Sequence, residues 1–347
     1  MATFKTNVEA FWKWFATNAA EFYAAIEDGN CAELAEPVQE ACGKWLPGFS
    51  WVFGPGPDGK GHSFTITGEG KPGFLFLASY WLELAPVLDG WTFYGSRQPS
   101  VLHADHQVKI ADQEFGPGEI LIKPIVYEED EQIGIDFWHP NFADSEEGLI
   151  FTVLGIWLDE SLGEIGSMAW IASAECKDLS GDPEAFPLTK LKQYVDYLQK
   201  EKGWEKLPPD ETYSLYQLPE QSDEFPRGDT ISGTTCNMEL VGAFLESAGH
   251  MEDPVEGTGA SFVYIGINRD QFPEGDEVNF RAEIEDAVDE ALRSGKSGRV
   301  FGGAFGLISG YIDLVIYDGD NSAALINQAL DAKGLGGEYF VRPFAKA

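Results

Sequence analysis

Residues 73–99, GFLFLASYWLELAPVLDGWTFYGSRQP, combine a nearly uninterrupted apolar run with a turn and an aromatic strand. Between Phe74 and Leu88 the only charged residue is Glu83, so the run predicts a helix covered by protein on most of its circumference. Pro86 lacks a backbone N–H and ends this helix. The run is shorter than the ~20 apolar residues that span a bilayer, so we expect a buried core helix.

The length and composition of the chain set the first limits. The chain has 347 residues, of which 44% are hydrophobic, which is enough for two or three domains with cores of their own. No positively charged leader precedes the first apolar residues, so we expect no signal peptide and a cytoplasmic location. The four cysteines are widely separated and form no CxxC pair, which predicts reduced thiols rather than a zinc site or disulfides.

The net charge of −35 is spread over the whole chain. Lys and Arg number 8 against 27 acidic residues in residues 1–176, 7 against 12 in 177–235, and 8 against 19 in 236–347. Such a surface argues against binding to nucleic acids or to anionic membranes, which basic patches recognise. It is compatible with a basic protein partner and equally with adaptation to a salty environment.

The first 185 residues predict helices and short strands. Residues 4–28 and 32–45 carry apolar side chains at helical spacing, which indicates an N-terminal helical hairpin. The order strand, strand, helix, strand then occurs twice, in residues 50–94 and 119–173. We therefore expect an α+β fold in which two duplicated ββαβ units lie on one mixed or antiparallel sheet.

The C-terminal residues give the clearest pattern. Strands at 261–267, 299–305, 311–317 and 339–344 alternate with amphipathic helices at 278–293 and 321–332 in the order βαββαβ, which predicts a ferredoxin-like domain. Along the third strand, alternation places Ile312, Leu314 and Ile316 against the helices and the residues between them on the opposite face.

The composition changes between the two folded parts. Residues 186–235 carry a lysine-rich helix and a long polar stretch with Pro208-Pro209, which is typical of a linker. We therefore expect an N-terminal α+β domain at 1–185, a helix and polar linker at 186–235, and the ferredoxin-like domain at 236–347.

Familiar catalytic and phosphate-binding motifs are incomplete. Residues 54–60, GPGPDGK, are followed by Gly61 where a phosphate loop needs Ser or Thr, and Lys296-Ser297 lacks the required first glycine. Gly302-Gly303 lie within a predicted strand and indicate a bulge or tight turn. We therefore predict no catalytic residues, no metal site and no cofactor.

A few residues stand out as candidates for binding. His103, Asp105 and His106 form the most compact cluster of histidines with an acid, and Trp138-His139 follow a predicted strand. Arg227 and Asp229 lie in the polar linker of a chain that is poor in cations. Tyr311 and Asp313 share a strand face, where aromatic neighbours could desolvate the carboxylate. We predict a role in binding, not in catalysis, for these residues.

Several short patterns resemble those of an uncharacterised bacterial family of unknown function. They are FWKWF at 11–15, APVLDGWTF at 85–93, LDESLGE at 158–164, and YQ at 216–217 followed by RGD at 227–229 and GTT at 233–235. The resemblance implies no activity and no catalytic residues. The acidic C-terminal part also looks like domains that accompany small acidic inhibitors of a bacterial ribonuclease, which is an analogy of fold.

Two functional hypotheses follow from these patterns. The first is a non-enzymatic, cytoplasmic binding or regulatory protein that recognises a basic protein, for example a nuclease regulator or neutraliser. The second is a hydrolase or small-ligand-binding protein with a site between the two domains, lined by the histidine candidates, Trp138, Arg227 and Asp229. The sequence leaves the oligomeric state open.

Overall fold

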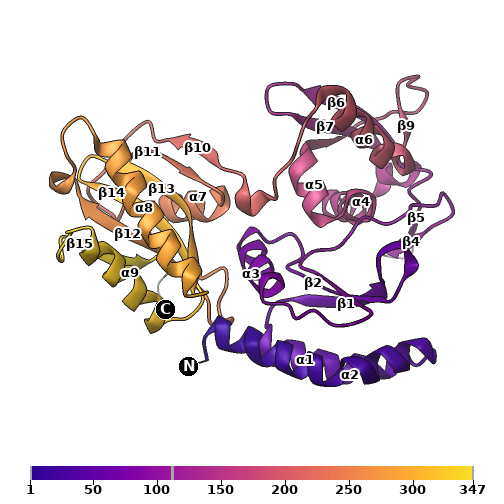
Figure 1. The fold of residues 1–347 in the computed structure, drawn as a ribbon. Coiled ribbons are helices and arrows are strands. Elements are labelled where there is room, and N and C mark those ends of the chain that lie inside the picture. Colours follow the sequence, from indigo (N-terminus) through magenta and orange to yellow (C-terminus); the bar gives the residue numbers. More distant parts are fainter. Residues whose placement is uncertain (1, 111–112, 346–347) are drawn as a thin grey trace. The chain divides into compact units, whose positions relative to one another are not determined.

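The computed structural model describes residues 2–110 and 113–345 (Figure 1). The chain forms two compact units, which we call the larger unit (residues 1–95 and 210–347) and the inserted unit (residues 96–209). The expected boundaries at 185 and 235 do not coincide with these units. The reason is that residues 214–235 add two strands to the larger unit, whereas the helix at 191–202 packs into the core of the inserted unit.

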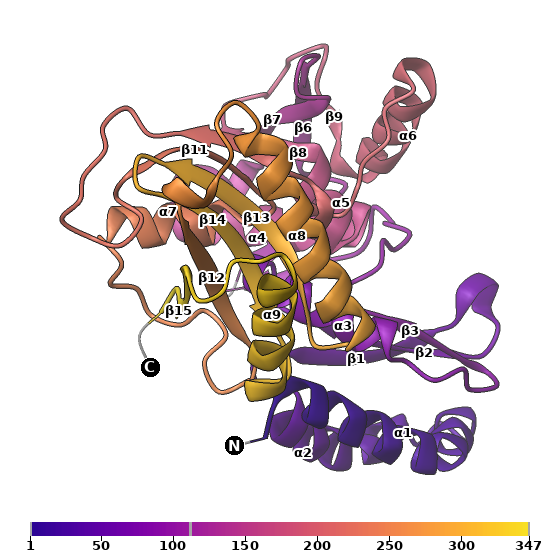
Figure 2. The same cartoon turned by 60° about the vertical axis from the view of Figure 1, so that its left-hand side comes forward.

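The larger unit begins with two helices and a small sheet. The predicted helical hairpin is α1 (Phe4–Glu27) and α2 (Ala35–Trp45), which lie side by side in Figure 2. A capping box between Thr3 and Thr6 starts α1. The strands β1 (Ser50–Pro55), β2 (His62–Thr67) and β3 (Trp91–Tyr94) form a sheet in which β1 is antiparallel and β3 parallel to β2.

The apolar run at the start of residues 73–99 forms a core helix of the larger unit, α3 (Pro72–Glu83). Its side chains are buried around most of the helix, as predicted. Trp81 stacks on Trp12 of α1 with ring centroids 4.3 Å apart, while Phe76 meets Phe301 of the C-terminal sheet at 5.5 Å. The helix therefore joins the N-terminal and C-terminal segments into one core.

Six antiparallel strands form the main sheet of the larger unit, in the order β10-β11-β13-β14-β12-β15. They are β10 (Ser214–Gln217), β11 (Thr230–Thr235), β12 (Ser261–Asn268), β13 (Gly298–Gly306), β14 (Ser309–Ile316) and β15 (Tyr339–Pro343). The four predicted C-terminal strands are all present. The sequence did not predict β10 and β11, because their polar composition resembles that of a loop.

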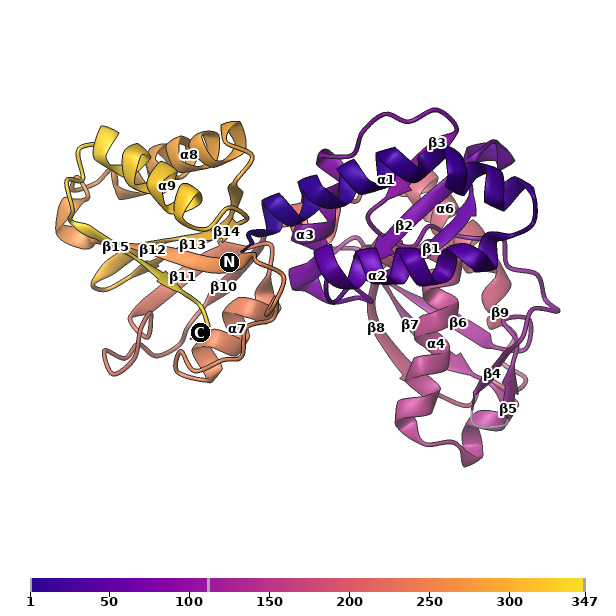
Figure 3. The same cartoon turned by 90° about the horizontal axis from the view of Figure 1, so that it is seen from below.

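Helices cover both faces of this sheet. The helices α8 (Glu277–Ser294) and α9 (Asp320–Ala332) lie on one face and α7 (Met238–Glu246) on the other, as Figure 3 shows. Ile312 and Leu314 belong to the core beneath α8 and α9, as the alternation predicts, whereas Tyr311 and Val315 belong to the opposite core. The register shifts between Val300 and Gly302, which agrees with the bulge expected at the glycines.

The inserted unit has its own sheets and core. The strands β6 (Leu121–Tyr127), β7 (Gln132–Trp138), β8 (Ile171–Cys176) and β9 (Phe186–Pro187) are ordered β8-β7-β6-β9, and β4 (Val108–Ile110) pairs with β5 (Gln113–Phe115). The helices are α4 (Glu147–Leu162), α5 (Glu164–Trp170) and α6 (Leu191–Lys202). Apolar residues of α4 and α6 pack with those of β6 and β7 in one core.

The expectation of one sheet shared by both ββαβ runs is wrong. Strands β1–β3 form one sheet in the larger unit, and β6–β8 belong to another in the inserted unit. Each sheet is covered by helices of its own unit, so the two sheets contribute to different hydrophobic cores.

Secondary-structure content defines the fold class. The structure is 42% helical and 25% strand, which makes this an α+β protein. Among the helices of the described residues, none combines the length and the apolar character needed to cross a bilayer.

Candidate functional site

Four of the predicted site residues lie together at the main sheet of the larger unit, namely Arg227, Asp229, Tyr311 and Asp313. Arg227 donates from Nη1 to Asp313 Oδ1 at 2.6 Å and from Nη2 to Oδ2 at 3.2 Å, and the two residues are 2% and 0% exposed. The guanidinium carbon also lies 5.0 Å from the ring centroid of Tyr311 and 5.2 Å from those of Tyr264 and Phe344. Arg227 and Asp313 thus form a buried ion pair that is surrounded by aromatic rings.

A tight turn before β11 directs Arg227 into this core. Arg227 has a positive φ of 63°, and its carbonyl accepts a hydrogen bond from the N–H of Thr230. At Gly228 a Cβ would lie 2.6 Å from the carbonyl oxygen of Ser222, so only glycine fits without a shift. The Arg-Gly-Asp sequence is therefore explained by local geometry that points the arginine inward.

Asp229 holds the turn between β13 and β14. Its Oδ2 accepts hydrogen bonds from the backbone N–H groups of Ile308 at 2.8 Å and Ser309 at 3.2 Å, and its Oδ1 accepts one from the hydroxyl of Tyr311. The residue is 5% exposed. The carboxylate thus ties the start of β11 to the neighbouring hairpin.

The histidine cluster lies in the inserted unit. His103, Asp105 and His106 are exposed and form a turn in which the His106 N–H bonds to the His103 carbonyl. The two imidazole rings are 5.0 Å apart, centroid to centroid. Across residues 2–110 and 113–345, no group of three or more His, Cys, Asp or Glu side chains is arranged to hold a metal ion.

His139 and Trp138 also belong to the inserted unit, at the end of β7. His139 is 2% exposed, and its Nδ1 accepts a hydrogen bond from the N–H of Asn141 at 3.1 Å. Burial lowers the pKa of this imidazole, while the Glu119 carboxylate, 3.7 Å from Nε2, partly offsets the effect. Trp138 is half-buried opposite Leu121. His139 therefore caps the start of the following short helix through Nδ1.

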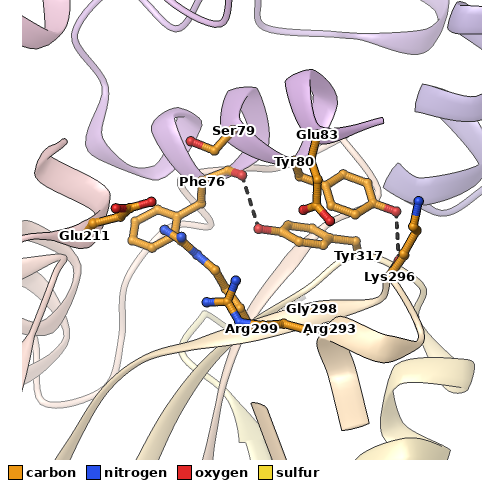
Figure 4. Close-up of a pocket in the computed structure, with 10 residues that line it drawn as sticks. All are labelled: Phe76, Ser79, Tyr80, Glu83, Glu211, Arg293, Lys296, Gly298, Arg299 and Tyr317. Atoms are coloured by element: carbon orange, nitrogen blue, oxygen red, sulfur yellow. Dashed lines mark hydrogen bonds between the residues drawn. The ribbon is translucent and has the colours of Figure 1, made fainter. Parts of the chain in front are cut away.

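The larger unit contains a pocket of about 220 Å³ (Figure 4). It lies between α3 and the turn that connects α8 to β13. The residues lining it are Phe76, Ser79, Tyr80, Glu83, Glu211, Arg293, Lys296, Gly298, Arg299 and Tyr317. Three of these ten are cations, although Lys and Arg make up only 23 of the 347 residues.

Sequence reasoning missed this pocket. Its cations Arg293, Lys296 and Arg299 fall within seven residues of an acidic chain, and this local excess was the signal that could have revealed them. The facing residues on α3 gave no such signal, because that helix reads as uniformly buried. The pocket therefore requires the tertiary structure, which brings α3 against the end of α8.

Glu285 on α8 is a second titratable group with an unusual environment. Burial raises its pKa to about 7, although Arg281, whose Nε lies 3.0 Å from its carboxylate, opposes the rise. At Gly303 a Cβ would come within 2.5 Å of the Glu285 carboxylate, so the glycine makes room for it over the sheet.

Replacing Glu285 with glutamine is expected to change how stability depends on pH. Because the folded state favours protonated Glu285, it binds more protons than the unfolded state between the ordinary pKa of 4.5 and about pH 7. The wild-type free energy of unfolding should therefore fall by about 3 kcal/mol, relative to Glu285→Gln, as the pH rises through this window. Urea unfolding of both proteins at several pH values tests this, and parallel pH profiles would contradict it.

The fold makes this an α+β protein. Comparison with known proteins does not assign it to a family or a functional class. No family model, no curated protein and no solved structure matches the chain. The resemblance to an uncharacterised bacterial family, which rests on short sequence patterns, therefore stays a prediction.

Proposed function

We propose that this protein binds a basic protein partner through its acidic surface and does not itself catalyse a reaction. The observation that carries the proposal is an excess of carboxylates that the fold leaves uncompensated, with 58 acidic residues against 23 Lys and Arg. Many of the cations are already paired within the units. Those in ion pairs include Lys5, Lys123, Lys177, Lys192, Lys202, Arg227, Arg281, Arg293, Arg299 and Lys333.

A long acidic segment runs along α8 and the turn before it. Residues 270–290 contain nine acidic residues. Of these, Glu274, Asp286 and Glu290 are exposed and have no cationic partner among the described residues. Such a surface accelerates the encounter with a positively charged partner and makes the association sensitive to salt.

A nuclease regulator or neutraliser is the concrete form of the proposal. Proteins that bind nucleic acids do so largely through Lys and Arg that contact phosphates. An acidic surface complements those same cations and would compete with the nucleic acid for them. The C-terminal part also looks like domains that accompany small acidic inhibitors of a bacterial ribonuclease, but a likeness of fold is weak support for function.

Affinity capture tests the proposal. We expect the immobilised chain to retain a basic protein at low ionic strength and to release it as salt is added, because screening weakens the attraction between exposed charges. The two purified proteins should then form a complex of defined stoichiometry by size-exclusion chromatography. Failure to retain any basic protein, or retention that salt does not affect, would contradict the proposal.

We also propose two finer features of the fold. The strand order β13-β14-β12-β15, with antiparallel neighbours and both α8 and α9 on one face, supports a ferredoxin-like arrangement extended by β10 and β11. A duplicated ββαβ unit is supported by the parallel pairing of the second and third strands in both runs, β2 with β3 and β7 with β8.

A further inference from the structure

We propose that the pocket between α3 and the α8–β13 turn binds a small zwitterion that carries a carboxylate and an ammonium group, of the size of a free amino acid. This inference is independent of binding to a basic protein. The two walls of the pocket carry opposite charges, and the fold leaves one buried donor of a lining residue, Arg299 Nε, unsatisfied.

The walls of the pocket carry opposite charges that do not touch. Glu83 on α3 is exposed to the pocket, and Arg293 at the end of α8 has a side chain that is 53% exposed. No ion pair joins the two among the described residues, although both line the same space (Figure 4). Burial lowers the pKa of Arg293, but its bond to Asp289 and the fields of Tyr317 and Glu83 raise it overall. A ligand with both charges fits between these walls.

Arg299 has one donor, Nε, that lacks an acceptor. Its Nη2 is fixed by the carbonyl and the carboxylate of Asp210, at 2.7 and 2.8 Å, and its guanidinium lies 4.6 Å from the ring centroid of Phe76. Its Nε is buried and has no hydrogen-bond partner among the described residues. Leaving a charged donor unsatisfied is unfavourable, and a carboxylate is the acceptor that suits a guanidinium best.

Lys296 adds a third cation from an unusual backbone position. It has a positive φ of 47°, where helices normally end on glycine or asparagine, and its carbonyl accepts a hydrogen bond from the Tyr80 hydroxyl at 2.8 Å. Its side chain is exposed and makes no ion pair within the described part of the chain.

The interior and the size of the pocket limit what it can hold. The rings of Tyr80 and Tyr317 pack against each other with centroids 4.1 Å apart and planes tilted by 31°, and their hydroxyls donate to backbone carbonyls rather than into the cavity. The volume of about 220 Å³ exceeds the space for one water molecule and is smaller than the ~300–1,000 Å³ of sites for drug-sized ligands. A pocket of this volume, with aromatic rings in its wall, suits the aliphatic part of a small zwitterion.

The acidic residues explain why a simple anion fits less well. Asp210 and Asp289 already neutralise Arg299 and Arg293, and Glu83 and Glu211 line the same cavity. An inorganic phosphate would therefore meet uncompensated carboxylates. A ligand whose ammonium group faces these carboxylates, while its own carboxylate meets the cations, satisfies both sets of charges.

Ligand titrations with single-charge controls test the proposal. The twenty free L-amino acids are tested one at a time by thermal unfolding and calorimetry, alongside acetate, methylammonium and inorganic phosphate at matched ionic strength. We expect at least one amino acid to raise Tm and to bind at a single site, about tenfold or more tightly than acetate or methylammonium. Phosphate or acetate binding as tightly as the best amino acid, or no binding by any amino acid, would overturn the proposal.

Variants of the two walls locate the site. Glu83→Gln and Arg293→Gln should each lower the affinity for the amino acid by about tenfold, because each removes one of the two charge contacts. Glu21→Gln and Lys13→Gln make the same charge changes at exposed positions of α1 and should leave the affinity unchanged. Circular dichroism confirms that all four proteins are folded. Equal losses in the wall variants and the α1 variants would contradict the assignment to this pocket.

Discussion

Replacing Asp313 with alanine is expected to lower the free energy of unfolding by about 3–5 kcal/mol, because it leaves the buried Arg227 guanidinium without its counter-ion. Both side chains are almost fully buried, so water cannot compensate for the lost partner. Arg227→Met should be destabilising for the same reason, since it leaves the carboxylate of Asp313 unpaired. Urea unfolding, followed by circular dichroism, measures each loss.

The double variant distinguishes this explanation from simple loss of packing. Arg227→Met combined with Asp313→Leu removes both charges and should be much more stable than either single variant, since hydrophobic replacements of buried ion pairs are often well tolerated. Asp196→Ala, which breaks the exposed pair between Lys192 and Asp196, serves as the matched control and should have little effect. Losses that simply add in the double variant would contradict the account.

Replacing Asp229 with alanine is expected to destabilise the protein by about 3 kcal/mol, the second-largest effect, since three hydrogen-bond donors lose their shared carboxylate. The effect should also be local, because two of the donors are the backbone N–H groups of Ile308 and Ser309. We expect the amide hydrogens of these two residues to exchange with solvent much faster in the variant.

Asn at position 229 provides the graded control for this prediction. Asp229→Asn keeps one carbonyl oxygen as an acceptor and should lose less stability than Asp229→Ala. If the amides of Ile308 and Ser309 remain protected in Asp229→Ala, then the carboxylate does not hold the hairpin and the account of this residue is wrong.

The sequence predicted the elements whose apolar pattern is strong and local. The sequence predicted the helix at residues 73–83 because a continuous apolar run indicates burial on all sides. It predicted the strands and helices of residues 261–343 because their apolar residues recur at a regular spacing. Strand β10 was missed because it is a short edge strand with three exposed residues, and β11 was missed because Thr, Ser and Gly in a largely buried strand resemble a loop. Thr230 and Thr235 are in fact fully buried.

The hydrophobic pattern of the sequence did not predict which segments share a core. The sequence predicted a domain boundary near residue 185. The chain instead passes from the larger unit into the inserted unit after residue 95 and returns to the larger unit at residue 210. Nothing in the local sequence indicates that α3 packs against the C-terminal sheet, because that choice depends on contacts between distant residues such as Phe76 and Phe301.

The candidate site residues show the same limit. Arg227 and Asp313 were each selected alone, one as a rare cation and the other as an acid between aromatic residues. Their pairing across 86 positions is a property of the tertiary structure. The pocket lined by Glu83, Arg293 and Arg299 was not predicted, because its two walls come from separate parts of the chain.

The central claim is that the protein binds a basic partner in a salt-sensitive way. The most direct test measures how fast two charge-neutralised variants associate with the basic protein recovered by affinity capture. One variant removes Glu274, Asp286 and Glu290 along α8 and its preceding turn, and the other removes Glu129, Asp130 and Glu147 of the inserted unit, each by change to the matching amide. If the acidic segment of α8 guides the partner, the first variant should associate about tenfold more slowly than wild type at low salt, while the second changes little. Equal rates for both variants and the wild type would contradict the claim.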